Sequence, residues 1–391
     1  MYRIRCLNNV SKKGLKILSD LGYEIDTGES EADAIILRSY KLADEDIKSS
    51  LRAIGRAGAG VNNIPVELCT EKGIVVFNTP GANANAVKEL VLAGLLLSSR
   101  GIVEGVNFVR ELESINDKTM FNKTVEEGKK AFKGTELKGK TLGVLGLGAI
   151  GSMVADMALA LGMKVIGYDP ALSVAAAWRV SSQIKRIDNL ANFFSNSDIV
   201  TLHVPATEET IGLVDETALS SFKNGSVLLN FSREEIVNEK ALKAALESGK
   251  IMKFVSDFPC SSLLGMDQAI LIPHLGASTA EAEENCALMV ATQLGEFLEN
   301  GSIKNSVNFP DVSLERVTGS LRLAIVNRNV PRILGSILSI LADRNINVLD
   351  MLNKSRGDIA YNLIDIEAKI SDDLIDEIER VDGVVSIRYF D

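Results

Sequence analysis

The residues of this chain that are best suited to chemistry begin with three glycines after an apolar run. Gly146, Gly148 and Gly151 give the spacing G-x-G-x-x-G in TLGVLGLGAIG. A turn of this kind brings backbone N–H groups and a helix N-terminus to one point, which attracts a pyrophosphate. Asp169 ends the next apolar run, KVIGYD, where a carboxylate can accept hydrogen bonds from a ribose diol and repels a 2′-phosphate. The pattern predicts a dinucleotide site that favours NAD(H) over NADP(H), although an ordinary βαβ unit can contain such a turn without a ligand.

The chain contains two histidines, and both follow apolar runs. His274 ends ILIPH, and a histidine at the carboxyl end of a strand suits proton transfer near neutral pH. A structural histidine that caps the loop is the alternative. His203 ends VTLH, and we interpret it as a structural or cofactor-lining residue.

An arginine occupies a similar position. Arg233 follows the apolar run SVLLNF, again where a strand is expected to end. A guanidinium there can hold a carboxylate through two hydrogen bonds and polarise an adjacent carbonyl oxygen. The alternative is a surface salt bridge at a helix start.

Alternating apolar runs and helical periods predict the elements that must position these groups. One long helix is expected over 86–112 and another over 279–300, whereas the polar, lysine-rich segment 114–140 is expected to be a loop or a mobile helix. Strands are expected at 2–7, 34–38, 164–168, 198–203, 226–231, 252–257 and 270–272.

This order predicts an α/β fold with two doubly wound, parallel-sheet domains of the Rossmann type. A discontinuous substrate-binding domain is expected over 1–95 plus 279–305, and the dinucleotide-binding domain over 96–278. A polar linker, 306–319, leads to a last domain over 320–391. Its β-α-β-β-α-β pattern is that of a ferredoxin-like α+β domain.

Composition excludes several classes of function. A net charge of −10 argues against nucleic acid as the partner. The start of the chain lacks a signal-peptide pattern and no apolar run could span a bilayer, so no membrane partner and a cytoplasmic location are expected. Isolated histidines and scattered cysteines give no metal site. Without C-x-x-C spacing the cysteines also indicate a reducing compartment; they are Cys6, Cys69, Cys260 and Cys286.

Several segments together resemble the D-2-hydroxyacid dehydrogenase family over nearly the whole chain. They are IGRAGAGVNNI, KGIVVFNTPGANANAVKELVLAGLL, GTELKGKTLGVLGLGAIG, LHVPAT, LLNFSREEIV and IPHLGASTAEAEENC. The resemblance implies NAD-dependent oxidation of 3-phospho-D-glycerate at C2, the first step of L-serine biosynthesis. His274 would take the C2 hydroxyl proton, and Arg233 would hold the substrate carboxylate and the C2 oxygen.

The resemblance also implies which residues surround the ligands. Three lysines of the polar segment, Lys129, Lys130 and Lys133, could hold the substrate phosphate or simply form a solvated face. The implied cofactor residues are Gly146, Gly148, Ala149, Ile150, Gly151, Asp169, His203, Pro205, Thr210, Ser232, Asp257 and Gly276. The implied substrate residues are Arg38, Ser39, Arg56, Ala57, Gly58, Ala59 and Gly60.

The chain departs from the family at one important position. Relatives usually carry a glutamate five residues after the residue equivalent to Asp257, where it orients the catalytic histidine. Here that position is Ser262, and the interval to His274 is shorter. The group that orients His274 is therefore not identified from the sequence.

The C-terminal domain resembles an ACT domain, a module that binds amino acids at paired edges. Asn327, Asn329 and Asn347 match effector positions of serine-inhibited relatives, with Asn327 in place of a histidine. The resemblance implies L-serine as an effector and a homodimer or homotetramer. Asn347 would also suit a plain turn after a helix.

Two other functions stay open. The anion-binding arginines do not identify the acid, so the chain could act on another D-2-hydroxy acid. It could also be an NADH-sensing binding protein without turnover.

Overall fold

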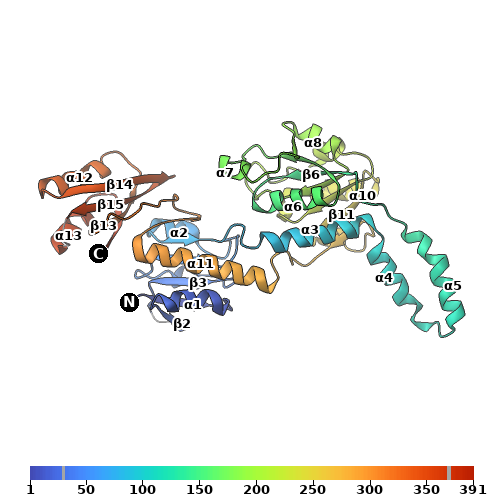
Figure 1. Ribbon diagram of the computed structural model, residues 1–391, viewed down its shortest axis with the longest axis horizontal. Helices are drawn as coiled ribbons and strands as arrows, with labels where there is room; N and C mark the ends of the chain where they lie inside the picture. Colours follow the sequence, from blue (N-terminus) through green and yellow to red (C-terminus); the bar gives the residue numbers. More distant parts are fainter. Residues whose placement is uncertain (29–30, 368–370) are drawn as a thin grey trace. The chain divides into compact units, whose positions relative to one another are not determined.

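The computed structural model describes residues 1–28, 31–367 and 371–391. Contacts divide the chain into two compact units (Figure 1). The first unit joins Met1–Asn83 to Ala280–Asp391, and the second is Ala84–Thr279. We describe each unit by itself.

The first unit contains a five-stranded parallel sheet with the order β2-β1-β3-β4-β5. Alternate side chains of its strands enter two apolar cores. One core, around Ile4 and Val75, packs against α1 and α11, and the other, around Ile54, packs against α2. The strands are β1 (Arg3–Leu7), β2 (Glu24–Asp26), β3 (Ala34–Leu37), β4 (Ala53–Arg56) and β5 (Val75–Phe77). The helices are α1 (Lys12–Asp20), α2 (Val66–Glu71) and α11 (Ala280–Asn300).

The chain returns to this sheet after the second unit through α11. Gly55 on β4 allows the close approach, since a Cβ there would lie 2.5 Å from Val290 and 2.9 Å from Leu294. The segment 306–319, expected to be a linker, is packed rather than free. Asn308, for example, accepts a hydrogen bond from the Val76 N–H (2.9 Å) and is buried.

The second unit contains a seven-stranded parallel sheet with the order β12-β11-β10-β9-β6-β7-β8. Apolar cores lie on both faces of this sheet, one including Val154 of α6 and the other Phe193 of α8, so the sheet is doubly wound. Its strands are β6 (Thr141–Leu145), β7 (Lys164–Tyr168), β8 (Lys185–Arg186), β9 (Ile199–Leu202), β10 (Ser226–Asn230), β11 (Ile251–Ser256) and β12 (Ala269–Leu271). Its helices are α3 (Ala84–Ser99), α4 (Ile102–Glu111), α5 (Lys118–Gly128), α6 (Ala149–Ala160), α7 (Val174–Ala177), α8 (Leu190–Asn196), α9 (Glu216–Ser221) and α10 (Glu239–Glu247).

The single helix expected over 86–112 is wrong, because the structure divides it into α3 and α4 at Gly101. A Cβ at Gly101 would lie 3.1 Å from the Cα of Phe132, so glycine permits the chain to pass closely here. The polar segment that follows contains α5, which Asp117 caps by accepting a hydrogen bond from the Met120 N–H (2.6 Å). Figure 1 shows α4 and α5 as a hairpin that extends from the sheet. The whole of α3 belongs to the second unit, whereas the boundary predicted from the sequence falls inside this helix, at residue 95.

The C-terminal part of the first unit is a four-stranded antiparallel sheet with the order β14-β15-β13-β16. Its elements follow the β-α-β-β-α-β pattern, and the predicted fold class is confirmed. They are β13 (Leu321–Arg328), α12 (Ile333–Asp343), β14 (Asn347–Arg356), β15 (Ile359–Glu367), α13 (Asp372–Glu379) and β16 (Val384–Phe390).

The two central strands of the C-terminal sheet, β13 and β15, are buried on both faces, whereas the edge strand β14 is mostly exposed. One face packs against α12 and α13. The other face contributes Val326, Tyr361 and Phe390 to the same core as Ile4 of the first sheet. No helix in the described part of the chain has the length and apolar character needed to cross a bilayer.

Candidate active site

The candidate residues of the second unit follow strand ends that form one row across the sheet. The strand register aligns Leu271, Ser256, Asn230, Leu202, Leu145 and Tyr168. Within three positions of these strand ends come His274, Asp257, Arg233, His203, Gly146 and Asp169. Because neighbouring strands lie about 4.8 Å apart, the loops of His274 and Arg233 begin about 10 Å from each other. The strand order reverses between β6 and β9, and ligands of open α/β sheets bind at such a point.

The glycine turn has the geometry that a pyrophosphate requires. Gly146 has φ +90°, and a Cβ on Gly151 would lie 1.9 Å from the Gly146 carbonyl oxygen. These two glycines are therefore required by the backbone itself. Gly148 differs, because no described atom lies within 4 Å of the position that its Cβ would take. Open space in front of Gly148, at the N-terminus of α6, fits the approach of a phosphate group. Ala149 and Ile150 form the first turn of that helix.

Asp169 is held beside this turn. Its carboxylate accepts hydrogen bonds from the Leu147 N–H (2.8 Å) and the Ala171 N–H (3.0 Å). It lines a cavity of about 570 Å³ whose other walls are mainly apolar and include Trp178 and Ile184. This cavity fits a flat ring system next to a ribose. Sequence reasoning missed its apolar wall, because Trp178 lies in no motif.

His203 lies next to Gly146, since a Cβ on that glycine would be 2.6 Å from the His203 carbonyl oxygen. Nε2 of His203 is hydrogen-bonded to the Thr201 hydroxyl (2.9 Å), and Nδ1 is buried without a partner among the described residues. Burial lowers the pKa of His203 to about 3, so its ring is neutral at physiological pH. A neutral ring with an unpaired nitrogen at the glycine turn fits a cofactor-lining residue and excludes a general acid near neutral pH.

His274 lies on a loop fixed by the neighbouring strand. Its backbone has φ +53°, and its N–H donates to the Asp257 carbonyl oxygen (2.9 Å). The Asp257 carboxylate accepts from the N–H groups of Leu275 (2.6 Å) and Gly276 (2.7 Å). Burial raises the pKa of Asp257, while these two donors and the nearby His274 act in the opposite direction. The His274 ring is exposed and meets the edge of the Phe258 ring, with 4.9 Å between centroids.

Arg233 is half-buried, three residues after the end of β10. Its Nη1 donates to the Ser232 carbonyl oxygen (2.6 Å), and its own carbonyl oxygen accepts from Nδ2 of Asn230 (2.8 Å). Asn230 is buried and also accepts from the Ser232 hydroxyl (3.1 Å), so it shapes this turn. Sequence reasoning missed Asn230, whose signal is a polar residue at the end of a buried apolar strand.

Two further cofactor candidates lie on the loop after β9. The Thr210 hydroxyl donates to the Pro205 carbonyl oxygen (2.5 Å) and accepts from the Thr207 N–H (2.8 Å). Both groups therefore stabilise their own loop.

The substrate candidates lie together at the carboxyl edge of the first sheet. The register pairs Leu37 on β3 with Arg56 on β4, and Arg38 follows directly. Nε of Arg56 donates to the Arg38 carbonyl oxygen (3.1 Å), and Nη1 of Arg38 pairs with Glu283 of α11 (2.7 Å). A Cβ at Gly58 would lie 1.8 Å from Nη1 of Arg56, so a larger residue there would displace the guanidinium. The other members of this group are Ser39, Ala57, Ala59 and Gly60.

The lysine candidates lie in the second unit after α5. They line an exposed cavity of about 590 Å³ together with Arg100. Lys129 forms an ion pair with Glu126. Lys130 and Lys133 line the same cavity as Lys129.

Ser262, which occupies the family's usual glutamate position, lies in a short 3₁₀ turn (Ser261–Leu263). Its hydroxyl donates to the carboxylate of Glu239, the first residue of α10. Within the described residues, no group of three His, Cys, Asp or Glu side chains could hold a metal ion.

The three effector candidates are divided between the two ends of the C-terminal sheet. Asn327 is buried, and its Oδ1 accepts from Nδ2 of Asn362 (2.7 Å). Asn329 lies just beyond β13, and its Nδ2 donates to the Gly357 carbonyl oxygen (3.1 Å). Asn347 pairs with Glu367 at the far end of β15. One chain therefore does not bring the three asparagines together.

Comparison with known proteins places this geometry in a family. The profile of the D-isomer specific 2-hydroxyacid dehydrogenase NAD binding domain matches residues 103–276. The D-3-phosphoglycerate dehydrogenase of Methanocaldococcus jannaschii is 33% identical over 385 residues, which cover 94% of this chain and 70% of that protein. The D-3-phosphoglycerate dehydrogenase of Escherichia coli is 32% identical over 411 residues, which cover 98% of this chain and 96% of that protein.

Solved structures agree. An NAD⁺-bound 3-phosphoglycerate dehydrogenase of Entamoeba histolytica matches with a TM-score of 0.61 and 27% identity, over 78% of this chain and 98% of that one. The apo D-mandelate dehydrogenase of Rhodotorula graminis matches with a TM-score of 0.66 and 25% identity, over 78% and 97% of the two chains. The chain belongs to the D-2-hydroxyacid dehydrogenase family. It is an NAD-dependent oxidoreductase, and its relatives named above include two D-3-phosphoglycerate dehydrogenases.

Proposed function

We propose that this chain oxidises 3-phospho-D-glycerate to 3-phosphohydroxypyruvate, the first step of L-serine biosynthesis. The observation that carries the proposal is the row of His274, Arg233 and the glycine turn at the carboxyl ends of parallel strands. The names of the relatives supply the substrate.

His274 and Arg233 divide the chemistry between them. NAD, when bound, accepts the hydride from C2. His274 takes the C2 hydroxyl proton, because the other histidine, His203, has a pKa of about 3 and is therefore too weak a base to hold that proton near neutral pH. Arg233 holds the carboxylate and stabilises negative charge on the C2 oxygen, which is often a large catalytic contribution. The arginines at the edge of the first sheet, Arg38 and Arg56, add positive charge for the anionic substrate, and the cluster of Lys129, Lys130 and Lys133 supplies charge for the phosphate.

A single-turnover assay tests this function. NADH oxidation is followed with 3-phosphohydroxypyruvate, pyruvate and glyoxylate as separate substrates. We expect 3-phosphohydroxypyruvate to be reduced far faster than the other two. Faster reduction of another keto acid would show a different D-2-hydroxyacid dehydrogenase, and the absence of turnover with NADH still bound would show a sensor.

A variant of the catalytic histidine gives the second test. We expect His274→Ala to lower kcat by at least roughly 100-fold, the effect of losing a positioned general base. NADH binding should persist and can be followed by fluorescence of Trp178, the chain's one tryptophan, which lines the cavity beside Asp169. Near-normal turnover of the variant would contradict the assignment of His274.

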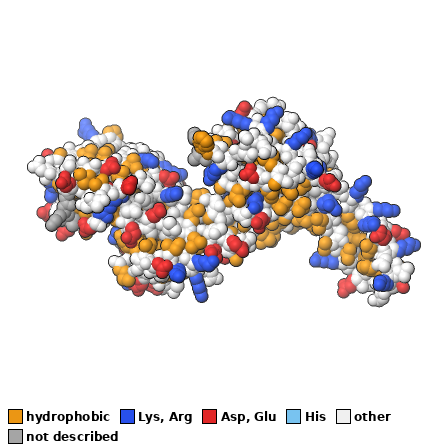
Figure 2. All heavy atoms as spheres, in the orientation of Figure 1, with side chains coloured by type: hydrophobic (Ala, Val, Ile, Leu, Met, Phe, Trp, Pro, Cys, Tyr) orange, Lys and Arg blue, Asp and Glu red, His pale blue; other side chains and the backbone are white. Residues whose placement is uncertain are grey.

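A second copy of the chain is the proposed partner of the α4–α5 hairpin. Figure 2 shows hydrophobic side chains along α3 and on this hairpin. On α4, Ile102, Val106 and Val109 are each about half exposed and recur at helical spacing, so they form one apolar face. A face of this kind on a helix that extends from the sheet fits a homodimer.

Two finer points belong to the same proposal. L-serine would act as an effector where two C-terminal sheets meet, because pairing two chains could bring Asn347 of one sheet to Asn329 of the other. Loss of activity on titration with L-serine tests this, and no change at millimolar concentrations with no binding heat would reject it.

The four cysteines are free thiols, which supports a reducing compartment such as the cytoplasm.

A further inference from the structure

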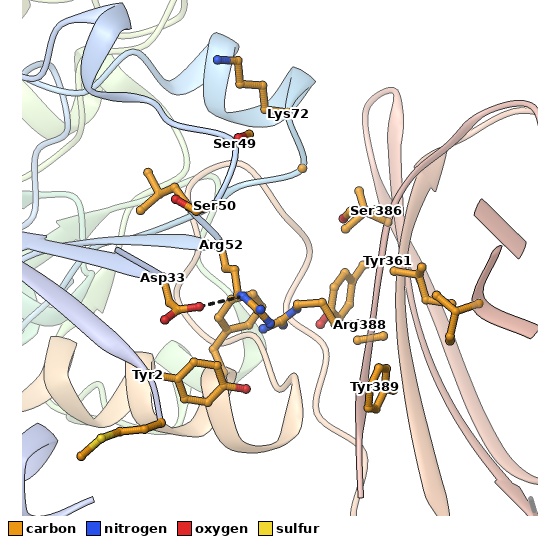
Figure 3. Close-up of a pocket in the computed structure, with 18 residues that line it drawn as sticks. Tyr2, Asp33, Ser49, Ser50, Arg52, Lys72, Tyr361, Ser386, Arg388 and Tyr389 are labelled. Atoms are coloured by element: carbon orange, nitrogen blue, oxygen red, sulfur yellow. Dashed lines mark ion pairs between the residues drawn. The ribbon is translucent and has the colours of Figure 1, made fainter. Parts of the chain in front are cut away.

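A second cavity lies within the first unit, between the amino ends of the first sheet and the C-terminal sheet. Its volume is about 630 Å³. Tyr2, Asp33 and Arg52 each directly precede a strand of the first sheet, whereas Ser386 and Arg388 lie on β16 (Figure 3). The substrate candidates occupy the opposite, carboxyl edge of the same strands. A four-residue strand such as β4 separates the two edges by about 13 Å, so this cavity is not part of the proposed active site.

Arg388 is the unusual residue of this cavity. Its two terminal nitrogens are buried, and neither makes a well-formed hydrogen bond to a described group. The oxygen of Tyr361 lies close enough to interact with the guanidinium, but its hydroxyl is engaged with the Gly301 carbonyl oxygen. Its guanidinium carbon lies 4.0 Å from the centre of the Phe297 ring and 5.2 Å from that of Phe390, which stabilises the cation but does not replace an acceptor. Burial lowers the pKa of Arg388 and the charge of Arg52 acts in the same direction, whereas Tyr361 acts in the opposite direction. A guanidinium without an acceptor in such a place costs free energy unless an anion joins it.

The other charged side chains that line the cavity do not supply an anionic partner for Arg388. Among the described residues that line it, three are cationic (Arg52, Lys72 and Arg388) and one, Asp33, is anionic. Asp33 pairs with Nε of Arg52 at 3.2 Å, and Nζ of Lys72 donates to the Ile47 carbonyl oxygen (2.9 Å). Figure 3 shows Arg52 and Arg388 pointing toward one another from opposite walls. The described side chains of the lining therefore have a net charge of +2, and the two guanidinium groups repel each other.

We propose that this cavity binds a small dianion, of the phosphate monoester or dicarboxylate kind, through Arg388 and Arg52. A planar guanidinium can hold an oxyanion with two parallel hydrogen bonds, and a charge of −2 balances the lining. The hydroxyl group of Ser386 is a further donor within the lining, whereas that of Ser50 donates to the Ala32 carbonyl oxygen (3.3 Å). Because one arginine belongs to each sheet, the bound anion links the first sheet to the C-terminal sheet. The site is thus separate from both the substrate candidates and the proposed L-serine position.

Calorimetry and thermal unfolding of the full chain test the proposal with inorganic phosphate and with malonate, at constant ionic strength. The test variant is Arg388→Met, which keeps the length of the side chain and removes its charge. The matched control is Arg380→Gln on α13, whose side chain is 77% exposed. We expect the original protein and the control to be stabilised by the same dianions, and the Met variant to bind at least roughly 10-fold more weakly at this site. The Met variant should fold at least as well in anion-free buffer, because an unsatisfied charge is removed.

Several outcomes are distinguishable. Equal binding by the Met variant and the original protein would overturn the proposal, as would the absence of any binding to the original protein. A response to phosphate but not malonate would assign the site to phosphate monoesters, and the reverse result to dicarboxylates. Asp33→Asn gives an independent check, since removing the one carboxylate should strengthen anion binding. These measurements need no turnover, so the result is separate from that of the proposed dehydrogenase activity.

Discussion

Asp257 clamps the loop of His274 from the neighbouring strand. Its carbonyl oxygen accepts from the His274 N–H at 2.9 Å, and its carboxylate accepts from the next two N–H groups at 2.6 and 2.7 Å. The loop that carries the proposed base is thereby held with a left-handed backbone at a residue other than glycine. Strain of this kind persists only where surrounding contacts fix it.

Replacing this clamp should lower turnover. We expect Asp257→Ala to reduce kcat on the order of 100-fold, since two hydrogen bonds to a charged acceptor are lost. Steady-state kinetics measure the effect, and circular dichroism checks that the fold persists. Asp257→Glu is the control for charge alone, and wild-type activity in the Ala variant would show that the loop holds itself.

Substitution can separate two roles of the glycine turn, which are to leave space for the cofactor and to allow the backbone to pack closely. Gly148→Ala should leave the melting temperature unchanged, because its Cβ meets no described atom, yet weaken NADH binding at least roughly 10-fold by filling the space for the phosphate. Gly151→Ala should lower both the melting temperature and the affinity for NADH, since its Cβ would lie 1.9 Å from the Gly146 carbonyl oxygen. Thermal unfolding and NADH titration distinguish the two variants. Tight NADH binding by Gly148→Ala would place the pyrophosphate elsewhere.

His203 should make stability depend on pH. Its pKa is lowered from 6.5 to about 3 in the folded chain, so the unfolded chain binds more protons between these values. The contribution of His203 to the free energy of unfolding is therefore fully present above pH 6.5 and is lost as the pH falls toward 3. The free energy of unfolding should decrease by about 3 kcal/mol between pH 6.5 and pH 4 for this reason. Urea unfolding should show a flatter dependence over that range in His203→Asn, and an identical slope would contradict the prediction.

The apolar face of α4 should control association. Val106→Glu places a charge within this face and should weaken self-association at least roughly 100-fold. Analytical ultracentrifugation measures the change. Asn107→Glu adds the same charge at the neighbouring exposed position and should leave the oligomer intact. An unchanged oligomer in both variants would place the interface on another surface.

Local patterns in the sequence were enough for much of this fold. The strand ends that carry Gly146, Asp169, Arg233 and His274 follow apolar runs bounded by turn residues, so their order along the chain predicts one row at the sheet edge. The break at Gly101 was missed because apolar residues continue on both sides of it. The glycine is needed only because Phe132, thirty-one positions later, packs against it.

The second cavity was beyond sequence reasoning for the same reason. Arg52 and Arg388 lie at opposite ends of the chain, and each alone is an unremarkable basic residue. Only the folded first unit reveals that the terminal nitrogens of Arg388 lack a well-formed hydrogen bond and that its guanidinium faces a second one. Asn230 was missed because its partners are backbone groups of the following turn, which no motif records.

The shared interior of the first and C-terminal sheets has a consequence for dissection of the molecule. Tyr361 donates to the Gly301 carbonyl oxygen (2.8 Å), and Phe390 and Val326 lie in one core with Ile4. Deleting residues 320–391 would expose apolar side chains of the first sheet and its helices to water. We expect the truncated protein to aggregate for this reason. A ligand that bound the C-terminal domain would therefore act on side chains that also form the interior of the first sheet.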